Sequence, residues 1–127
     1  MVKISRVGRV LVPVASQDAA ITFYTEKLGF SLTSDVAFGE GSRWVEVTPP
    51  AGGTALALVP PQGEYLPGRM TGIAFESADP RADHAELVER GVDVDAELMG
   101  GDGEVPLLFF FRDVDRNQLM VVASAPS

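Results

Sequence analysis

The sequence predicts an α+β protein made of two βαβββ modules in tandem, related by a pseudo-twofold axis. Two segments carry this prediction, VLVPVASQDAAITFYTEKLGF (Val10 to Phe30) and GIAFESADPRADHAELVERGV (Gly72 to Val92). At a shift of about 62 residues, both show an apolar run, a Ser/Asp-rich turn, an amphipathic stretch and a terminal glycine. Helices that follow single strands and cover one sheet face favour the α+β class. A cleft between two such halves is a natural place for a small ligand.

Length and composition limit the classes of protein that remain. The 127 residues are enough for one domain with a hydrophobic core, which 46% hydrophobic residues can fill. No apolar run approaches the roughly 20 residues that span a bilayer. The net charge of -8 disfavours nucleic acid and anionic membranes as partners. The absence of cysteine and of an N-terminal signal-like apolar region favours a cytoplasmic protein.

The first module is expected at about residues 5–60. Its first strand has a face lined by Val10, Val12 and Val14, and Pro13, which lacks an N–H, predicts either an unpaired edge or a local irregularity there. A helix capped around Asp18 should follow and end near Leu28, where Gly29 stops it. This helix should present Ile21, Tyr24 and Leu28 on one face. The expected strands after it are Phe30–Val36, Arg43–Thr48 and Thr54–Val59.

The second module is expected at about residues 70–124, after a Pro- and Gly-rich linker at about 60–69. Its first strand is Met70–Ser77. A helix should start at Asp79-Pro80 and end at Gly91, with Ala82, Ala85, Leu87 and Val88 buried. The remaining strands are expected near Val92–Glu97, Leu107–Arg112 and Asn117–Ala123.

Three stretches of the chain resemble the vicinal oxygen chelate superfamily, which includes glyoxalase I, bleomycin-resistance proteins and extradiol dioxygenases. They are VPVASQDAAITFYTEKLGF, GIAFESADPRADHAELVERGV and FFRDVDRNQLMVV, the last similar to the family's closing F-x-D-P-D-G-N turn and apolar strand. The resemblance covers nearly the whole chain. It implies curled mixed sheets that enclose a cavity, often in a homodimer, but it does not select one activity, because this fold hosts many chemistries.

The enzymes of that superfamily usually hold a divalent metal with His, Glu or Gln side chains on strand positions that face the cavity. The resemblance places these positions at Arg9, Gly72 and Met120, with another near Ala57. Arginine offers no lone pair, glycine and alanine have no donor atom, and a methionine thioether suits copper(I). We therefore expect no metal of the usual kind and no other cofactor.

Other residues are candidates for a displaced metal site. Glu46 and Glu76 lie on expected strands, where two carboxylates with waters could hold Mg²⁺. His84, the one histidine, falls in the second helix, where we expect it at the solvent-exposed edge.

Strand alternation predicts which side chains face the cavity. Arg9 and Leu11 point away from the valine face, and Arg9 needs an anion, supplied by Glu46, Glu76 or a ligand. In the LLFFF run, either Leu108 and Phe110 or Phe109 and Phe111 should be core. The candidate ligand-binding set is Arg9, Leu11, Trp44, Glu46, Ala57, Gly72, Ala74, Phe109, Phe111 and Met120.

These observations favour a protein that binds a small organic molecule, aromatic or anionic, by enclosure, as the bleomycin-resistance branch does. One alternative is a glyoxalase-like lyase, isomerase or dioxygenase with a displaced metal or with Glu46 or Glu76 as a base. Another is a structural or regulatory module with an exposed apolar patch and a filled cavity.

Overall fold

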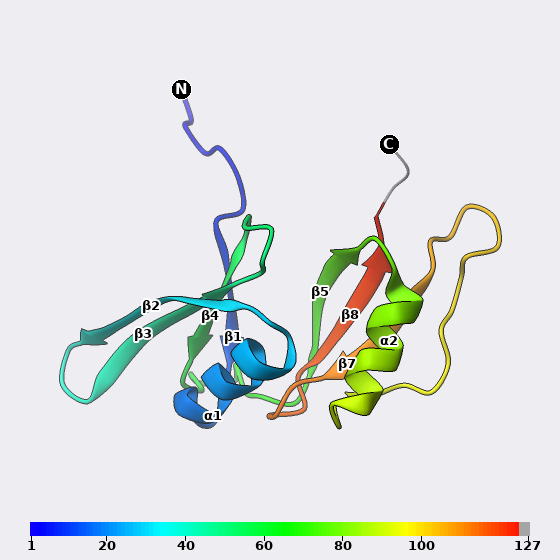
Figure 1. Ribbon diagram of the computed structural model, residues 1–127. Helices are drawn as coiled ribbons and strands as arrows, with labels where there is room; N and C mark the ends of the chain where they lie inside the picture. Colours follow the sequence, from blue (N-terminus) through cyan, green and yellow to red (C-terminus); the bar gives the residue numbers. More distant parts are fainter. Residues whose placement is uncertain (125–127) are drawn as a thin grey trace. The chain divides into compact units, whose positions relative to one another are not determined.

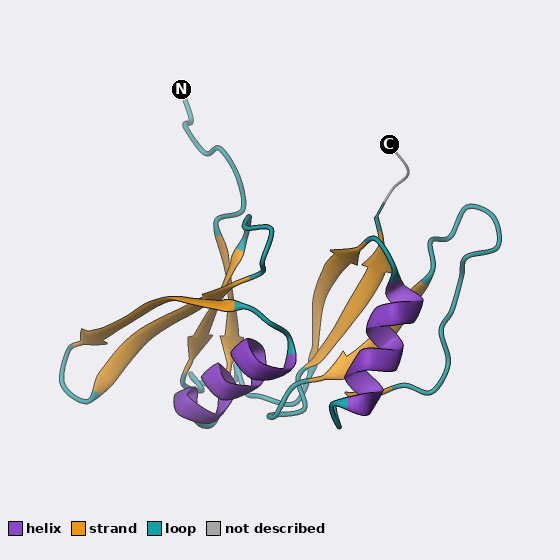
Figure 2. Cartoon of the chain, viewed as in Figure 1, coloured by secondary structure: helices purple, strands orange, loops and turns teal. Residues whose placement is uncertain are grey.

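The computed structural model describes residues 1–124, and the chain divides into two compact units, Met1–Pro67 and Gly68–Ser127. Each unit combines one four-stranded sheet with one helical segment (Figures 1 and 2). The α+β class and the tandem arrangement of two modules are therefore confirmed. The pseudo-twofold axis and a cavity enclosed by the two sheets stay predictions.

The first unit forms a mixed sheet in the order β1-β4-β3-β2. β1 runs parallel to β4, and the other neighbours are antiparallel. β1 lies at the edge of this sheet, which is the first of the two alternatives that Pro13 predicted. The elements are β1 (Arg9–Pro13), α1 (Gln17–Thr22), the π-helical turn η1 (Phe23–Lys27), β2 (Ser31–Phe38), β3 (Ser42–Thr48) and β4 (Ala55–Val59).

The second unit repeats that topology in the order β5-β8-β7-β6. Its first and last strands are again parallel neighbours, so the duplication read from the sequence extends to strand order and direction. The elements are β5 (Met70–Ser77), α2 (Pro80–Glu89), β6 (Asp93–Val94), β7 (Leu108–Arg112) and β8 (Gln118–Ala123).

Both helices begin with a side-chain cap. The Ser16 hydroxyl accepts a hydrogen bond from the Ala19 N–H at 3.1 Å, and the Asp79 carboxylate accepts one from the Ala82 N–H at 3.2 Å. Such oxygens satisfy N–H groups that have no partner inside the first helical turn. In α2, Pro80 occupies the first position, where its missing N–H costs nothing.

The hydrophobic core of each unit lies between its helix and one face of its sheet. In the first unit, Tyr24 from η1 is fully buried and β4 is buried along its whole length. In the second unit, Leu87 of α2 is buried, as are apolar side chains of β7 and β8. The largest members of the two cores are Val12, Val14, Tyr24, Val45, Val47, Leu56, Leu58, Phe109, Phe111 and Leu119.

Two expectations about the second unit were wrong. Ala82, Ala85 and Val88 are exposed, because α2 turns Pro80, His84 and Leu87 inward instead, at the i, i+4, i+7 spacing of one helix face. The strand expected at Val92–Glu97 shortens to β6, Asp93–Val94, although the Asp95 N–H still donates to the Phe110 carbonyl at 3.0 Å. None of the helices within residues 1–124 has the length and apolar character needed to cross a bilayer.

Candidate functional site

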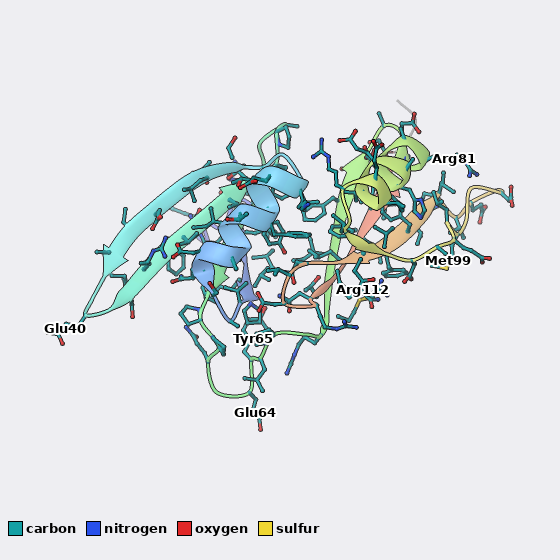
Figure 3. All side chains as sticks on the ribbon, turned by 60° about the horizontal axis from the view of Figure 1, so that its bottom comes forward. Glu40, Glu64, Tyr65, Arg81, Met99 and Arg112 are labelled. Atoms are coloured by element: carbon teal, nitrogen blue, oxygen red, sulfur yellow. The ribbon has the colours of Figure 1, made fainter. Side chains whose placement is uncertain are left out.

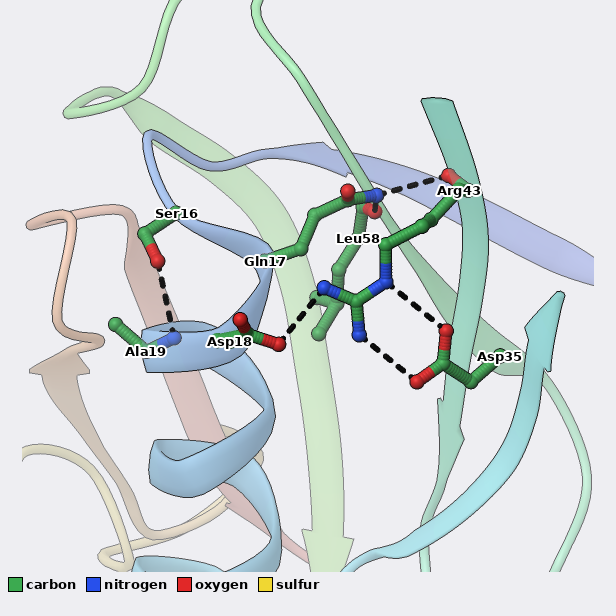
Figure 4. Close-up of polar contacts among 7 residues, drawn as sticks. All are labelled: Ser16, Gln17, Asp18, Ala19, Asp35, Arg43 and Leu58. Atoms are coloured by element: carbon green, nitrogen blue, oxygen red, sulfur yellow. Dashed lines mark hydrogen bonds and ion pairs between the residues drawn. The ribbon is translucent and has the colours of Figure 1, made fainter. Parts of the chain in front are cut away.

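A polar network on the helix side of the first sheet fixes the position of β3 (Figure 4). The Arg43 guanidinium donates to both carboxylate oxygens of Asp35 on β2, at 3.1 and 2.8 Å, and to Asp18 of α1 at 2.7 Å. Gln17 Nε2 donates at 2.9 Å to the carbonyls of Arg43 and Leu58. Helix α1 is thereby bonded to two neighbouring strands on one face of the sheet.

The same network changes proton affinities. The hydrogen bonds from Arg43 hold the pKa of the Asp35 carboxyl below its usual range, because they favour its charged form. Hydrogen bonds to Asp35 and then Asp18 raise the pKa of the Arg43 guanidinium. The bidentate geometry is the one in which arginine and carboxylate planes match best. Arg43 is therefore a structural residue, and its neighbour along β3 points to the other face.

That other face of the first sheet carries five residues of the predicted binding set. Strand pairing aligns Leu11 with Ala57 and Ala57 with Glu46, so their side chains share one row across β1, β4 and β3. Arg9 and Trp44 lie two residues along their strands from that row and point to the same side. Because α1 covers the opposite face, where Arg43 meets Asp18, these five side chains lie on the helix-free face of the unit.

Three of these side chains form one bonded cluster, which we call the Arg9–Glu46–Trp44 cluster. Arg9 Nε and the Trp44 indole N–H both donate to Glu46 Oε2, at 2.9 and 2.6 Å. The Glu46 side chain is 13% exposed, whereas that of Arg9 is 52% exposed. Of the anions that could pair with Arg9, Glu46 is thus the one that does so. The two donors also hold the indole ring at a fixed position on the face.

Tyr65 adds a contact that comes from the segment after β4. Its hydroxyl donates to the carbonyl of Leu11, and a backbone bridge between Gln62 and Tyr65 closes the turn that carries it. Figure 3 labels Tyr65 among the side chains of the protein. Leu11 lies on the edge strand β1, where such carbonyls have no sheet partner on the outer side. The linker expected at 60–69 therefore includes a turn attached to the first sheet.

The second unit brings together only part of its predicted set. Ala74 and Met120 are paired across β5 and β8, and Phe110 is paired with Met120 across β7. Phe109 and Phe111 lie on the opposite face, where they are 0% and 1% exposed. The prediction that these two rings share a site with Met120 was wrong. Phe110 takes that place, and strand alternation alone could not choose between the two sets.

Gly72 occupies a break in the pairing of β5. The register of β5 with β8 shifts between Met70 and Ala74, and Gly72 has a φ of 76°, a left-handed conformation that favours glycine. Thr71 Oγ1 donates to the Gln118 carbonyl at 2.8 Å and accepts from the Ile73 N–H at 3.1 Å. The glycine is thus explained by a β-bulge that bends an edge strand.

His84 lies in the interior side of α2 rather than at its exposed edge. Its ring meets Phe109 edge-on at 5.1 Å between centroids, and Nε2 lies 2.7 Å from the Asp95 carbonyl. The side chain of Asp95 in turn binds Arg112 at 2.6 Å. This part-buried cluster ties α2 to the segment after β6 and to β7, which is a structural role.

The positions that the resemblance assigns to metal ligands do not fit a divalent metal. Arg9, Ala57, Gly72 and Met120 offer no oxygen or imidazole donor. The nearest carboxylate, Glu46, already accepts two hydrogen bonds on one oxygen. Across residues 1–124, no three His, Asp or Glu side chains are grouped closely enough to hold a metal ion.

Comparison with known proteins gives consistent matches over nearly the whole chain. A family model described as the Glyoxalase/Bleomycin resistance protein/Dioxygenase superfamily matches residues 6–121. The uncharacterized protein YetH of Bacillus subtilis is 30% identical over 121 residues, which cover 93% of this chain and 98% of YetH. The structure of TnmS3, an antibiotic binding protein from Streptomyces sp. CB03234, is 34% identical with a TM-score of 0.84, covering 98% of this chain and all (100%) of TnmS3. A superfamily member from Sphaerobacter thermophilus is 30% identical with a TM-score of 0.88, covering 95% and 98% of the two chains.

Proposed function

Because this chain belongs to the glyoxalase/bleomycin resistance protein/dioxygenase superfamily, we propose that it binds a small aromatic molecule without a resident metal ion. Trp44 carries the proposal. Its ring is half-buried on a helix-free sheet face, and its N–H is fixed on Glu46. A held aromatic ring on the same face as the exposed, apolar Leu11 suits stacking with a planar ligand. The similarity to an antibiotic binding protein supports binding as the activity.

The mechanism would be sequestration by mass action. Apolar contact with Leu11 and the Trp44 ring would supply affinity, and the Arg9–Glu46 pair would orient polar groups of the ligand. No covalent step is needed. We further propose that the protein is cytoplasmic and forms a homodimer. Sedimentation equilibrium would distinguish the dimer from a monomer of 13.5 kDa.

A thermal-shift screen of planar aromatic compounds, including antibiotics, tests this function. A ligand that binds only the native state raises the melting temperature. Because the chain has one tryptophan, a ligand bound at this face should also change the intrinsic tryptophan emission. A library without a single compound that does both would contradict the proposal.

Replacement of Trp44 tests whether the ligand binds at the helix-free face of the first sheet. Trp44→Ala should weaken binding of a compound from that screen about tenfold or more, since stacking and apolar contact are both lost. Val114→Ala, at an exposed apolar residue in the second unit, is the control and should bind as wild type does. Equal affinities for both variants, measured by titration calorimetry, would place the ligand elsewhere.

A further inference from the structure

The hydrogen bonding of the two Glu46 carboxylate oxygens indicates which polar group an aromatic ligand of this site should carry. Both donors meet the same oxygen, Glu46 Oε2. Within residues 1–124, Glu46 Oε1 accepts no hydrogen bond, although only 13% of the side chain is exposed. Oε1 is not among the fully buried oxygens without a partner, so it can be reached from solvent. A ligand placed over Trp44 would displace that water, and the carboxylate oxygen would then need another donor. A ligand O–H or N–H can supply that donor.

The charges of the cluster point the same way. Arg9 and Glu46 form an ion pair at 2.9 Å, so the cluster has no net charge to offer an anion. A ligand carboxylate placed over Trp44 would lie beside the Glu46 carboxylate, and like charges repel strongly where water is scarce. Arg9, with half of its side chain in solvent, could compensate only after giving up hydration or its bond to Glu46.

We infer that this site selects a neutral, planar aromatic ligand that carries a hydrogen-bond donor, and that it discriminates against aromatic carboxylates. The inference rests on the proposed function and narrows its ligand class. Glu46 is then the specificity-determining residue: Oε2 holds the site together and Oε1 receives the ligand donor. An Arg9 side chain without a paired carboxylate would have favoured anionic ligands, and its ion pair with Glu46 removes that preference.

Three probes of similar size test the inference on the unmodified protein. β-Naphthol is neutral and has a donor, β-naphthyl methyl ether has an acceptor only, and β-naphthoate is an anion. By titration calorimetry at neutral pH, naphthol should bind about tenfold more tightly than either of the others, the worth of one hydrogen bond to a charged group. Naphthoate binding as tightly as naphthol would overturn the inference.

Glu46→Gln provides a sharper test because it nearly preserves shape. The amide oxygen can replace Oε2 as acceptor for Arg9 and Trp44, which leaves the NH₂ group where Oε1 was. The preference of naphthol over the ether should then disappear, and naphthoate should become the tightest probe, since Arg9 has lost its counter-charge. Glu76→Gln, an exposed glutamate on β5, is the matched control and should keep the wild-type order.

The outcomes separate the inference from the proposed function. If Glu46→Gln keeps the wild-type order of the three probes, Glu46 does not read the ligand and the inference fails. If no naphthalene probe binds while another aromatic class perturbs Trp44 emission, the inference fails and the proposed function stands. If no aromatic compound of any class binds, both fail.

Discussion

At the scale of single residues, pairing between side chains changes what a residue can do. Arg9 was expected to need an anion from Glu46, Glu76 or a ligand, and in the structure Glu46 is the one that pairs with it. Trp44 was expected in the ligand-binding set, and its indole N–H proves to be bonded to that same carboxylate. These bonds join residues 37 and 2 positions apart. Sequence alone could nominate these residues, but it could not show that they neutralise one another.

Arg116 offers a test of backbone strain in the turn between β7 and β8. Among the described residues it is the one non-glycine residue with a positive φ, 66°. A side chain there costs about 1–2 kcal/mol in sterics, partly offset by the larger entropy that glycine loses on folding. Arg116→Gly should therefore raise the free energy of unfolding by about 0.5–1 kcal/mol in urea titration. Arg116→Ala keeps the strained Cβ and serves as control; an equal gain there would contradict the explanation.

Asn117 should be the most sensitive polar residue of the same turn. It is 0% exposed; its side chain donates to Asp113 Oδ2 at 3.0 Å and accepts from the Gly68 N–H at 2.9 Å. Asn117→Ala removes both bonds in a buried place and should lower the free energy of unfolding by about 2–4 kcal/mol, measured in urea. Ser31→Ala, at an exposed position of β2, is the surface comparison, and a similar loss of stability there would contradict the special role of Asn117.

At the scale of elements, most of the agreement came from periodicity and stop signals. Alternating valines, a Ser/Asp turn and a glycine stop act locally, so they indicated β1, both helices and β5. The error at Phe109 and Phe111 arose from register. The turn between β7 and β8 pairs Arg112 with Gln118 and hence Phe110 with Met120. A turn shorter by one residue would have placed Phe109 there, because a one-residue slip exchanges the faces of a strand.

The Arg43 network makes an element-scale prediction about acid. Because the pKa of Asp35 is lowered in the folded state, its contribution to stability is present above the unfolded pKa of about 3.8. It is lost as the pH falls through the lower folded pKa. Asp35→Asn should therefore lower the urea midpoint at pH 7, and the difference from wild type should shrink below about pH 4.

The control for this prediction is Glu40→Gln, in the turn between β2 and β3. It removes one negative charge from the same hairpin without removing a bond to Arg43. Its midpoint should follow that of the wild type at both pH values. A difference between Asp35→Asn and wild type that does not change between pH 7 and pH 3 would contradict the assigned role of the ion pair.

At the scale of the whole molecule, duplication is the main feature. Each unit forms one mixed sheet with first and last strands parallel, covered on one face by its helix. The helix-free faces differ in chemistry: the first carries the charged and aromatic Arg9–Glu46–Trp44 cluster, whereas the second carries Ala74, Phe110 and Met120. Copies of one topology have thus acquired different side chains on this face: the second has its own ion pairs, from Arg112 to Asp93 and Asp95, but the one tryptophan lies on the first.

Metal independence is a prediction for the whole molecule. Since no group of three suitable ligands occurs within residues 1–124, treatment with EDTA should leave the melting temperature unchanged and leave affinity for an aromatic ligand unchanged. Differential scanning calorimetry and titration calorimetry measure the two quantities. A lowered melting temperature that Zn²⁺, Ni²⁺ or Mn²⁺ restores would instead support a displaced metal site and the enzymatic alternative.

The sequence by itself determined the class of fold, the two-module organisation and most strand and helix positions. Periodicity, capping residues and glycine stops depend on neighbours along the chain, so these signals can be read without coordinates. Tertiary structure alone decided that Glu46 pairs with Arg9, that His84 packs on Phe109 and that Phe110 rather than Phe109 lies beside Met120. These contacts depend on strand register and on residues distant in the chain, because a one-residue change in a turn reverses which side chains meet.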